Sequence, residues 1–384
     1  MNCLELRVPN QALQCMALLR RMPRNHPVRP IVEKDLRSWM KGYYGEKQVA
    51  YYLSLLPEEP YYIFHGLRIK DKKYFQMDLL ILTMNFGLIV EIKNISGTIC
   101  FKKGSNSVMR VYENNEEGIS NPIEQVKRHK MQFHNWLSKN QIKGYPIEHL
   151  VTFSKTSTLI ETTPDNTQIF KYVIYAESLI NKIKELEMKY PNTHLSKKKL
   201  IHLTESLLQA HQPLMIDILQ TYNLSQSNLY PGVQCPMCKK YPMEYYSANW
   251  NCLNCHHKSK TAHLQAVDDY FLIISPTMTR KQFGEFLLLR SPLVAKHQLR
   301  ALNLPSTGSK RTTQYYLPPG CILSPLKEND MKKGKFTHET SIMPALGSAN
   351  SGILQTTACT SLSTFKNPDS STHSQNNIGF HCGS

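Results

Sequence analysis

The chain has 384 residues, 41% of them apolar, which is long enough for two or three domains and excludes a generically disordered protein. Its 46 lysines and arginines outnumber its 29 aspartates and glutamates. The resulting formal charge of +17 favours a polyanionic partner, either nucleic acid or an anionic membrane surface. No apolar run reaches the roughly 18 residues of a membrane span, and residues 1–21 lack the pattern of a signal peptide, so we expect no membrane anchor.

The beginning of the chain is basic. Three prolines between residues 23 and 30 disfavour a long helix, and we expect residues 1–37 to form a leader that drapes over the first domain. Apolar and aromatic residues then recur at helical spacing from Trp39 to about Leu56, where prolines follow. This pattern predicts a first helix with Glu46 in its opening turns.

Short strand-like runs come next, separated by turns rich in Gly, Asn and Lys. A helix is expected after Asn121, which would be its N-cap, with Pro122 at the first helical position and Glu124 at the capping-box position. Together these elements predict an α/β domain with a mixed sheet flanked by helices. The predicted strands cover residues 61–69, 77–82, 87–92, 97–101, 107–112, 147–154 and 170–176.

Beyond this domain, helical periodicity surrounds a cysteine-rich module. Thr279 with Gln282 has the pattern of a capping box, and Ser291 followed by Pro292 marks another helix start, which predicts a helical hairpin. The end of the chain is rich in Ser, Thr and Asn, and we expect it to be disordered. The predicted segments are a leader (1–37), the α/β domain (38–177), a helical linker (178–230), the cysteine module (231–262), the hairpin region (263–321) and the tail (322–384).

Two neighbouring strands carry an acidic pattern, "FQMDLLIL" followed by "GLIVEIK". If they pair through a turn at residues 84–87, with Thr83 still in the strand and opposite Leu88, Asp78 faces Lys93, and Glu91 lies diagonally beside Asp78. Strand side chains alternate between two faces, so the three charged groups share one face while Ile92 points into the core. A slip of one residue would separate them.

This arrangement suits phosphodiester hydrolysis. Asp78 and Glu91 could hold a hard cation such as Mg²⁺, and Lys93 could stabilise developing charge or position the attacking water. The alternative is a charge pair at a solvated strand end. The preceding runs are apolar on both faces, as in central buried strands, and this favours the catalytic interpretation.

Four blocks together, "GYYGE", the Asp of "MDLLIL", "VEIKNISG" and "NPIEQVKRH", resemble NERD (nuclease-related) domains, which are akin to PD-(D/E)xK nucleases. The resemblance covers about residues 38–150. It implies a PD-(D/E)xK-like fold with Mg²⁺ or Mn²⁺ as cofactor and nucleic acid, DNA rather than RNA, as substrate. It gives the catalytic positions to Asp78, Glu91 and Lys93, an additional acid to Glu46 and a polar helix position to Gln125.

The helix after Asn121 carries a basic run formed by Lys127, Arg128, His129 and Lys130. Such a run could contact nucleic-acid phosphates. A charge run can equally be an ordinary solvated helix face.

The cysteine module contains "CPMC" and "CLNC", two CxxC pairs suited to holding one tetrahedral zinc ion in a zinc ribbon. Its four thiolates, Cys235, Cys238, Cys252 and Cys255, would fill the coordination sphere, so we expect a structural site. His256 could replace Cys255. The scattered spacing of the other cysteines argues against a disulfide framework and favours a reducing, cytoplasmic environment.

Aromatic residues in this module, Tyr241, Tyr245, Tyr246 and Trp250, lie among lysines. They could stack on nucleic-acid bases, or they could form the core of a small module.

From the acidic pattern and the family resemblance, we expect a metal-dependent nuclease in the cytoplasm. The alternatives are a non-catalytic nucleic-acid-binding or regulatory adaptor that uses the zinc ribbon, and a protein-interaction module with structural zinc only.

Overall fold

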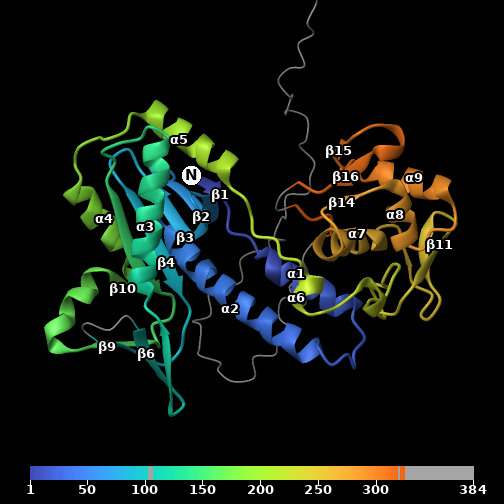
Figure 1. Ribbon diagram of the computed structural model, residues 1–384, viewed down its shortest axis with the longest axis horizontal. Helices are drawn as coiled ribbons and strands as arrows, with labels where there is room; N and C mark the ends of the chain where they lie inside the picture. The colour runs from blue at the N-terminus through green and yellow to red at the C-terminus, as the bar shows by residue number, and fades with distance from the viewer. Residues whose placement is uncertain (103–106, 319–320, 325–384) are drawn as a thin grey trace, which may run out of the picture.

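The structure is a computed structural model that describes residues 1–102, 107–318 and 321–324 (Figure 1). It has two lobes. The sheet lobe contains strands β1–β10, and the ribbon lobe contains strands β11–β16 with helices α7–α9. Apart from its first three residues, the tail predicted to be disordered (322–384) lies outside the described residues.

A six-stranded mixed sheet forms the centre of the sheet lobe, with the strand order β1-β2-β3-β4-β8-β10. The β2–β3 and β3–β4 pairs are antiparallel, and the other three pairs are parallel. This confirms the predicted mixed α/β architecture. The strands are β1 (Asn2–Leu4), β2 (Tyr62–Lys70), β3 (Tyr74–Leu82), β4 (Gly87–Lys93), β8 (Ile147–Phe153) and β10 (Val173–Tyr175).

Helices cover both faces of this sheet. Helices α3 and α5 pack on the face that includes Leu80 and Ile89, and α2 and α4 pack on the face that includes Leu79 and Val90. Both faces of β4 are therefore buried, as the apolar run predicts. Helices α4 and α5 were expected in a linker, but they complete these layers. The helices are α2 (Arg29–Leu53), α3 (Pro122–Lys139), α4 (Leu179–Lys189) and α5 (Lys197–Ala210).

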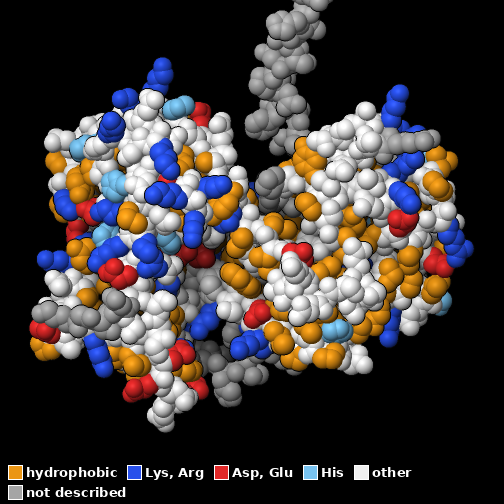
Figure 2. Space-filling model, viewed as in Figure 1, with side chains coloured by type: hydrophobic (Ala, Val, Ile, Leu, Met, Phe, Trp, Pro, Cys, Tyr) orange, Lys and Arg blue, Asp and Glu red, His pale blue; other side chains and the backbone are white. Residues whose placement is uncertain are grey.

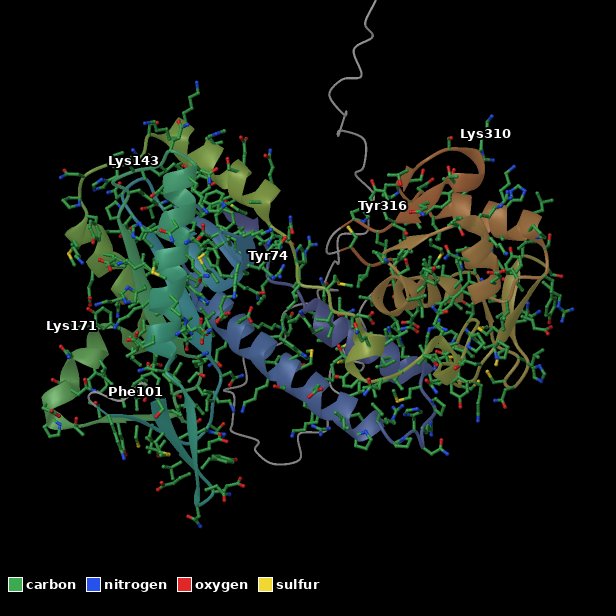
Figure 3. All side chains as sticks on the ribbon, viewed as in Figure 1. Tyr74, Phe101, Lys143, Lys171, Lys310 and Tyr316 are labelled. Atoms are coloured by element: carbon green, nitrogen blue, oxygen red, sulfur yellow. The ribbon has the colours of Figure 1, made fainter. Side chains whose placement is uncertain are left out.

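A four-stranded sheet, in the order β7-β6-β5-β9, continues from the end of β4. Gly97 leads into it with φ +102°, and a Cβ atom there would lie 2.3 Å from the carbonyl oxygen of Val111, so the position requires glycine. Phe101 lies at the end of β5 and is buried (Figure 3). The strands are β5 (Thr98–Phe101), β6 (Ser107–Tyr112), β7 (Asn115–Ser120) and β9 (Leu159–Thr162), of which β7 and β9 were not predicted.

The first 37 residues form regular structure where a draped leader was expected. Strand β1 pairs with β2, and helix α1 (Asn10–Arg21) follows. The prolines separate α1 from α2. Pro30 lies in the first turn of α2, where N–H groups have no partner within the helix, so a proline is tolerated there. Helix α2 therefore begins ten residues before the predicted start at Trp39.

Arg21 joins α1 to the ribbon lobe. Its side chain is fully buried and forms an ion pair with Asp269 on α7 at 2.9 Å. It also donates hydrogen bonds to the carbonyl oxygens of Tyr230 (2.8 Å) and Gly232 (3.1 Å), and its guanidinium carbon lies 4.3 Å from the ring centroid of Phe286. The N-terminal helix is thus fixed to elements about 210 to 265 residues away in the sequence.

The ribbon lobe contains both predicted helix starts. The Thr279–Gln282 capping box opens α8, and the Ser291 side chain accepts a hydrogen bond from the N–H of Val294 at the start of α9. Helix α7 and the sheet β14-β16-β15 were not predicted. The elements are β11 (Met243–Tyr246), β12 (Asn249–Cys252), β13 (Lys258–Ser259), α7 (Ala262–Ile273), β14 (Thr277–Met278), α8 (Arg280–Phe286), α9 (Pro292–Ala301), β15 (Ser306–Thr307) and β16 (Gln314–Tyr316).

Short elements complete the described chain. In the segment after α5, Gln212 accepts a hydrogen bond from the hydroxyl of Tyr74, which holds this segment against the start of β3 (Figure 3). The remaining elements are α6 (Ile218–Thr221) and the 3-10 helices Pro164–Lys171, Ala176–Ser178, Gln226–Asn228 and Lys310–Thr312.

Candidate active site and candidate zinc centre

The β3–β4 hairpin has a register two residues away from the predicted one. Leu79 pairs with Val90 and Leu82 pairs with Gly87, so the next position places Asp78 opposite Glu91. The reason lies in Thr83, which was expected in the strand. It belongs to the turn, because its N–H donates to the carbonyl oxygen of Phe86, and its hydroxyl accepts from the N–H of the same residue. A register shift of two residues keeps each side chain on the same face of the sheet. Asp78, Glu91 and Lys93 therefore still share one face, as predicted.

Asp78 and Glu91 meet at the buried end of β4. The Asp78 Oδ2 atom accepts a hydrogen bond from the Ile92 N–H at 2.9 Å, which fixes the carboxylate against the neighbouring strand. Glu91 is only 2% exposed, and Ile92 is buried on the opposite face. The two carboxyl groups are close enough for each to affect the pKa of the other.

Lys93 links this pair to helix α3. Its ammonium group donates to Glu91 Oε1 at 2.6 Å and to Gln125 Oε1 at 3.0 Å. Gln125 is placed by the start of α3, where the Asn121 side chain accepts from the Ile123 N–H as the predicted N-cap. Lys93 and Gln125 are therefore both brought to the acidic pair.

The capping-box role expected for Glu124 is not observed. Glu124 forms an ion pair with Lys127 at 2.8 Å instead, one turn along the helix surface.

Glu46 reaches the site from helix α2. The preceding residue, Gly45, packs so closely on the end of β4 that a Cβ atom there would lie 2.6 Å from the Asn94 Cβ. Asn94 in turn donates to the carbonyl oxygen of Lys41 at 2.7 Å, so the helix is attached to the strand end. The half-buried carboxyl group of Glu46 is close enough to Asp78 and Glu91 to be affected by their charges.

Burial raises the pKa of all three carboxyl groups, and the charge of neighbouring acids adds to this for Glu46 and Glu91. Burial, followed by the charges of Asp78 and Glu91, raises the pKa of Glu46 to about 8. Burial and the charge of Asp78 also raise the pKa of Glu91 to about 8, against the opposing effect of Lys93. Burial also raises the pKa of Asp78, and the hydrogen bond from the Ile92 N–H partly offsets this increase. Near neutral pH the site therefore retains protons that a bound cation would displace.

The donor set fits a hard divalent cation held by two direct ligands. The Glu91 Oε2 atom is buried and makes no hydrogen bond to any residue that the structure describes. Among the described residues, the four cysteines are the only set of three or more possible metal ligands whose atoms all lie within 4.8 Å of one another. At least two of the carboxyl groups of Glu46, Asp78 and Glu91 are therefore farther apart than that. A buried carboxylate oxygen without a hydrogen-bond partner among the described residues, next to a second carboxyl group, is a donor suited to a hard cation.

His129 lies beside the candidate site, although in the sequence it stands out only as part of a basic run. Its Nδ1 atom lies 3.7 Å from Glu91 Oε2. Burial, together with the charges of Arg128 and Lys93, lowers its pKa to about 4, so the ring is neutral at physiological pH. Its position four residues after Gln125, on the same helix face, is the signal that could have identified it.

The other members of that basic run point elsewhere. Lys127 and Arg128 are exposed, and Lys130 is half-buried near Glu148, whose pKa its charge helps to lower. Contact between Lys127, Arg128 or Lys130 and nucleic acid stays a prediction.

A second group of cations surrounds the segment that leaves β4. Arg110 donates to the carbonyl oxygen of Ser96 at 2.8 Å, and the Lys155 ammonium lies 3.1 Å from the Ser96 hydroxyl. Burial, with the charges of Arg110 and Lys155, lowers the pKa of Lys41. These three residues come from α2, β6 and the end of β8, so no local sequence pattern connects them.

The four cysteines form the predicted cluster. All their sulfur atoms lie within 4.8 Å of one another, with the Cys235 and Cys255 sulfurs 3.6 Å apart and the Cys238 and Cys252 sulfurs 3.5 Å apart. A tetrahedral ion with Zn–S bonds of about 2.3 Å requires sulfurs about 3.8 Å apart, so the geometry fits zinc.

Two similar turns present these sulfurs. The N–H of Lys239 donates to the Cys235 carbonyl oxygen, and the N–H of His256 donates to the Cys252 carbonyl oxygen, each at 3.0 Å. Lys239 and His256 both have positive φ, at 61° and 57°. The two turns present all four cysteine sulfurs at the cluster, and His256 lies in the second turn.

Two of the aromatic residues considered for stacking on bases, Trp250 and Tyr245, pack in the core of the module. Trp250 is fully buried, and its indole N–H donates to His263 Nδ1 at 3.1 Å. Tyr245 packs against Trp250 with ring centroids 5.2 Å apart and accepts a hydrogen bond from Gln298. Tyr246 is the exposed member of the predicted set, at 52%. A small module without many aliphatic residues needs these rings for its own packing.

Residues 41–154 match the family model of the nuclease-related domain. An uncharacterized protein of Bacillus anthracis is 24% identical over 187 residues, which are 48% of this chain and 83% of that protein. No solved structure matches. Within the described residues, no helix has the length and apolar character needed to cross a membrane.

The raised carboxyl pKa values predict how stability depends on pH and Mg²⁺. Folded pKa values of about 8 for Glu46 and Glu91, above the ordinary 4.5, mean that stability decreases as pH rises from about 4.5 through about 8. Because a cation displaces these protons, Mg²⁺ should raise the melting temperature more at about pH 8.5 than at about pH 5.5. A concentration of 100 times the Kd would add about 2.7 kcal/mol.

Thermal unfolding with and without Mg²⁺ measures this effect. Glu91→Gln should abolish most of the Mg²⁺-dependent shift, whereas Glu205→Gln, an exposed carboxylate on α5, should retain it. Equal shifts in both variants would contradict a cation site at Glu91.

The cysteine cluster predicts about one zinc ion per chain in protein purified under reducing conditions, measured by inductively coupled plasma mass spectrometry. Cys238→Ser combined with Cys255→Ser should lose the metal and lower the melting temperature, because structural zinc contributes folding energy. Cys3→Ser, a change outside the cluster, should keep the zinc. Metal-free protein that is unaffected by a chelator would exclude a zinc centre.

Proposed function

We propose that the sheet lobe is a metal-dependent nuclease that hydrolyses phosphodiester bonds in nucleic acid, with DNA as the expected substrate. The observation that carries the proposal is the convergence of Asp78, Glu91 and Lys93 at the buried end of β4, within residues that match the nuclease-related domain. A PD-(D/E)xK-like fold is part of the proposal, supported by the central position of the acidic strand in a mixed sheet flanked by helices.

The acidic residues have distinct proposed roles. Asp78 and Glu91 hold Mg²⁺ or Mn²⁺, which when bound supplies Lewis-acid stabilisation of the phosphoryl oxygens. Glu46, whose raised pKa keeps a proton near neutral pH, lies on the helix side of the pair and can exchange a proton with water there.

Lys93 is proposed to act on the reacting phosphate, and Gln125 is proposed to position Lys93. The Lys93 ammonium, 22% exposed, is oriented by Glu91 and by the Gln125 side-chain oxygen, and it stabilises negative charge that develops on the phosphate or positions the attacking water. Because Gln125 contacts Lys93, its proposed role is to position that ammonium group.

The charge distribution supports a polyanionic substrate. Lysines and arginines are spread over both lobes (Figure 2), in agreement with the net charge of +17. Lys41, Arg110 and Lys155 gather beside the segment that leaves β4, where phosphates flanking the reacting group would lie.

The ribbon is proposed as a structural zinc module. Four cysteine ligands leave no open coordination position, and Trp250 and Tyr245 are used in packing. The alternative of a purely ribbon-based adaptor therefore has less support, because two of its four candidate aromatic contacts are used in packing.

Cleavage of a labelled DNA fragment tests the proposed activity. The full-length protein with Mg²⁺ or Mn²⁺ should degrade or nick the DNA, and Asp78→Ala should abolish cleavage because one of two direct ligands is lost. Lys93→Met should reduce the rate by roughly 100- to 1,000-fold, the effect of removing one transition-state charge stabiliser.

Glu205→Ala, an exposed acidic position on α5, serves as the matched control and should cleave at the parental rate. Metal-dependent cleavage that survives Asp78→Ala would exclude this assignment, and the absence of cleavage of both DNA and RNA would favour a non-catalytic adaptor.

A further inference from the structure

A cavity of about 840 Å³ lies away from the acidic site, between the start of α2, the end of α1 and the first cysteine turn. In Figure 1 these N-terminal helices run beneath the ribbon lobe. The cavity is lined by segments far apart in the sequence, including residues 16–37 and 230–241. Its volume is in the upper part of the ~300–1,000 Å³ range of ligand sites. We call it the junction groove.

The junction groove is strongly basic. Six arginines and lysines line it, and Glu33 is its single acidic lining residue. That carboxylate is paired with Arg29 at 3.0 Å, and Arg20 is paired with Asp269 at 2.6 Å. The side chains of Arg24, Arg37 and Lys240 are exposed and can reach a ligand. A concave surface of this charge suits phosphate groups.

The wall of the junction groove also offers an aromatic face. Tyr230 and Tyr241 stack with ring centroids 5.5 Å apart and ring planes inclined at 23°. Tyr241 is held from behind by Arg21, whose guanidinium carbon lies 5.6 Å from its ring centroid, while Tyr230 remains 44% exposed. Cations next to an accessible ring are what single-stranded nucleic acid requires, because phosphates and base faces are contacted together.

The groove is fixed before any ligand binds. Arg21 donates to the Tyr230 carbonyl oxygen, and the Tyr230 N–H donates back to the Arg21 carbonyl oxygen, both at 2.8 Å. The ion pair between Arg21 and Asp269 holds this contact in the ribbon lobe. Ligand binding therefore does not need to order the two walls, which lowers its entropic cost.

We propose that the junction groove binds a single-stranded nucleic-acid segment, with Arg24, Arg37 and Lys240 on the phosphates and Tyr230 on a base. It would hold substrate at a second place, outside the acidic site. The choice of nucleic acid as ligand rests on the proposed function, but the groove itself is independent of Asp78 and Glu91.

Fluorescence anisotropy with a labelled single-stranded oligonucleotide, full-length zinc-loaded protein and no added Mg²⁺ tests this proposal. Arg37→Glu combined with Lys240→Glu should weaken binding at least about tenfold and reduce the slope of log K against log salt by about 1.4, since each phosphate contact to a single strand contributes ~0.7. Lys296→Glu combined with Arg300→Glu on α9 makes the same charge change outside the groove and should have less than about a twofold effect.

Tyr230→Ala should weaken binding about tenfold through lost base stacking, whereas Tyr51→Ala, an exposed tyrosine on α2, should not. Inorganic polyphosphate supplies the comparison with a ligand that has no bases. If the groove and control variants lose affinity equally, the site is excluded. If polyphosphate binds as tightly as the oligonucleotide and Tyr230→Ala changes neither, the groove is a general polyanion site and the nucleic-acid assignment is wrong.

Hydrolysis of the small diester bis(p-nitrophenyl) phosphate separates this inference from the proposed function. Such a substrate needs only the acidic site, so the groove variants should retain its hydrolysis. Groove-dependent oligonucleotide binding without any hydrolysis would contradict the nuclease and leave the groove supported. Hydrolysis of the diester combined with oligonucleotide binding that the groove variants do not weaken would support the nuclease and contradict the groove.

Discussion

The proposed function of the sheet lobe depends on the burial of two carboxyl groups at the end of strand β4. Asp78 and Glu91 lie beside each other where water is largely excluded, and burial raises the pKa of both and of a third acid, Glu46. The ion pair to Lys93 offsets part of this cost. A fold that keeps such an arrangement loses stability with rising pH unless a cation is bound, which connects the electrostatics of the site to its proposed chemistry.

Helix α2 connects that site to the junction groove. Its 25 residues span about 37 Å at 1.5 Å per residue. Gly45, in its second half, packs on Asn94 at the end of β4, and Arg37, in its first half, lines the groove. The N-terminal residues are therefore a structural part of both lobes, since α1 is fixed to α7 through Arg21 and Asp269.

Local patterns in the sequence were enough for much of the fold. Strand alternation located β2 to β6, and the Asn121 cap located the start of α3. The β3–β4 register could not be read in the same way, because it depends on whether Thr83 belongs to the strand or to the turn. Helix α1 and the burial of Trp250 depend on partners distant in the sequence, so no local period reveals them.

The central claim is that Asp78 and Glu91 together hold a divalent cation. A crystal structure of the protein with Mn²⁺, with the ion identified by anomalous diffraction, tests it most directly. The account predicts one manganese ion bridged by the Asp78 and Glu91 oxygens, with Lys93 directed to the adjacent space. An empty site, with Glu91 still bonded to Lys93 and the two carboxylates turned apart at a saturating Mn²⁺ concentration, would contradict it.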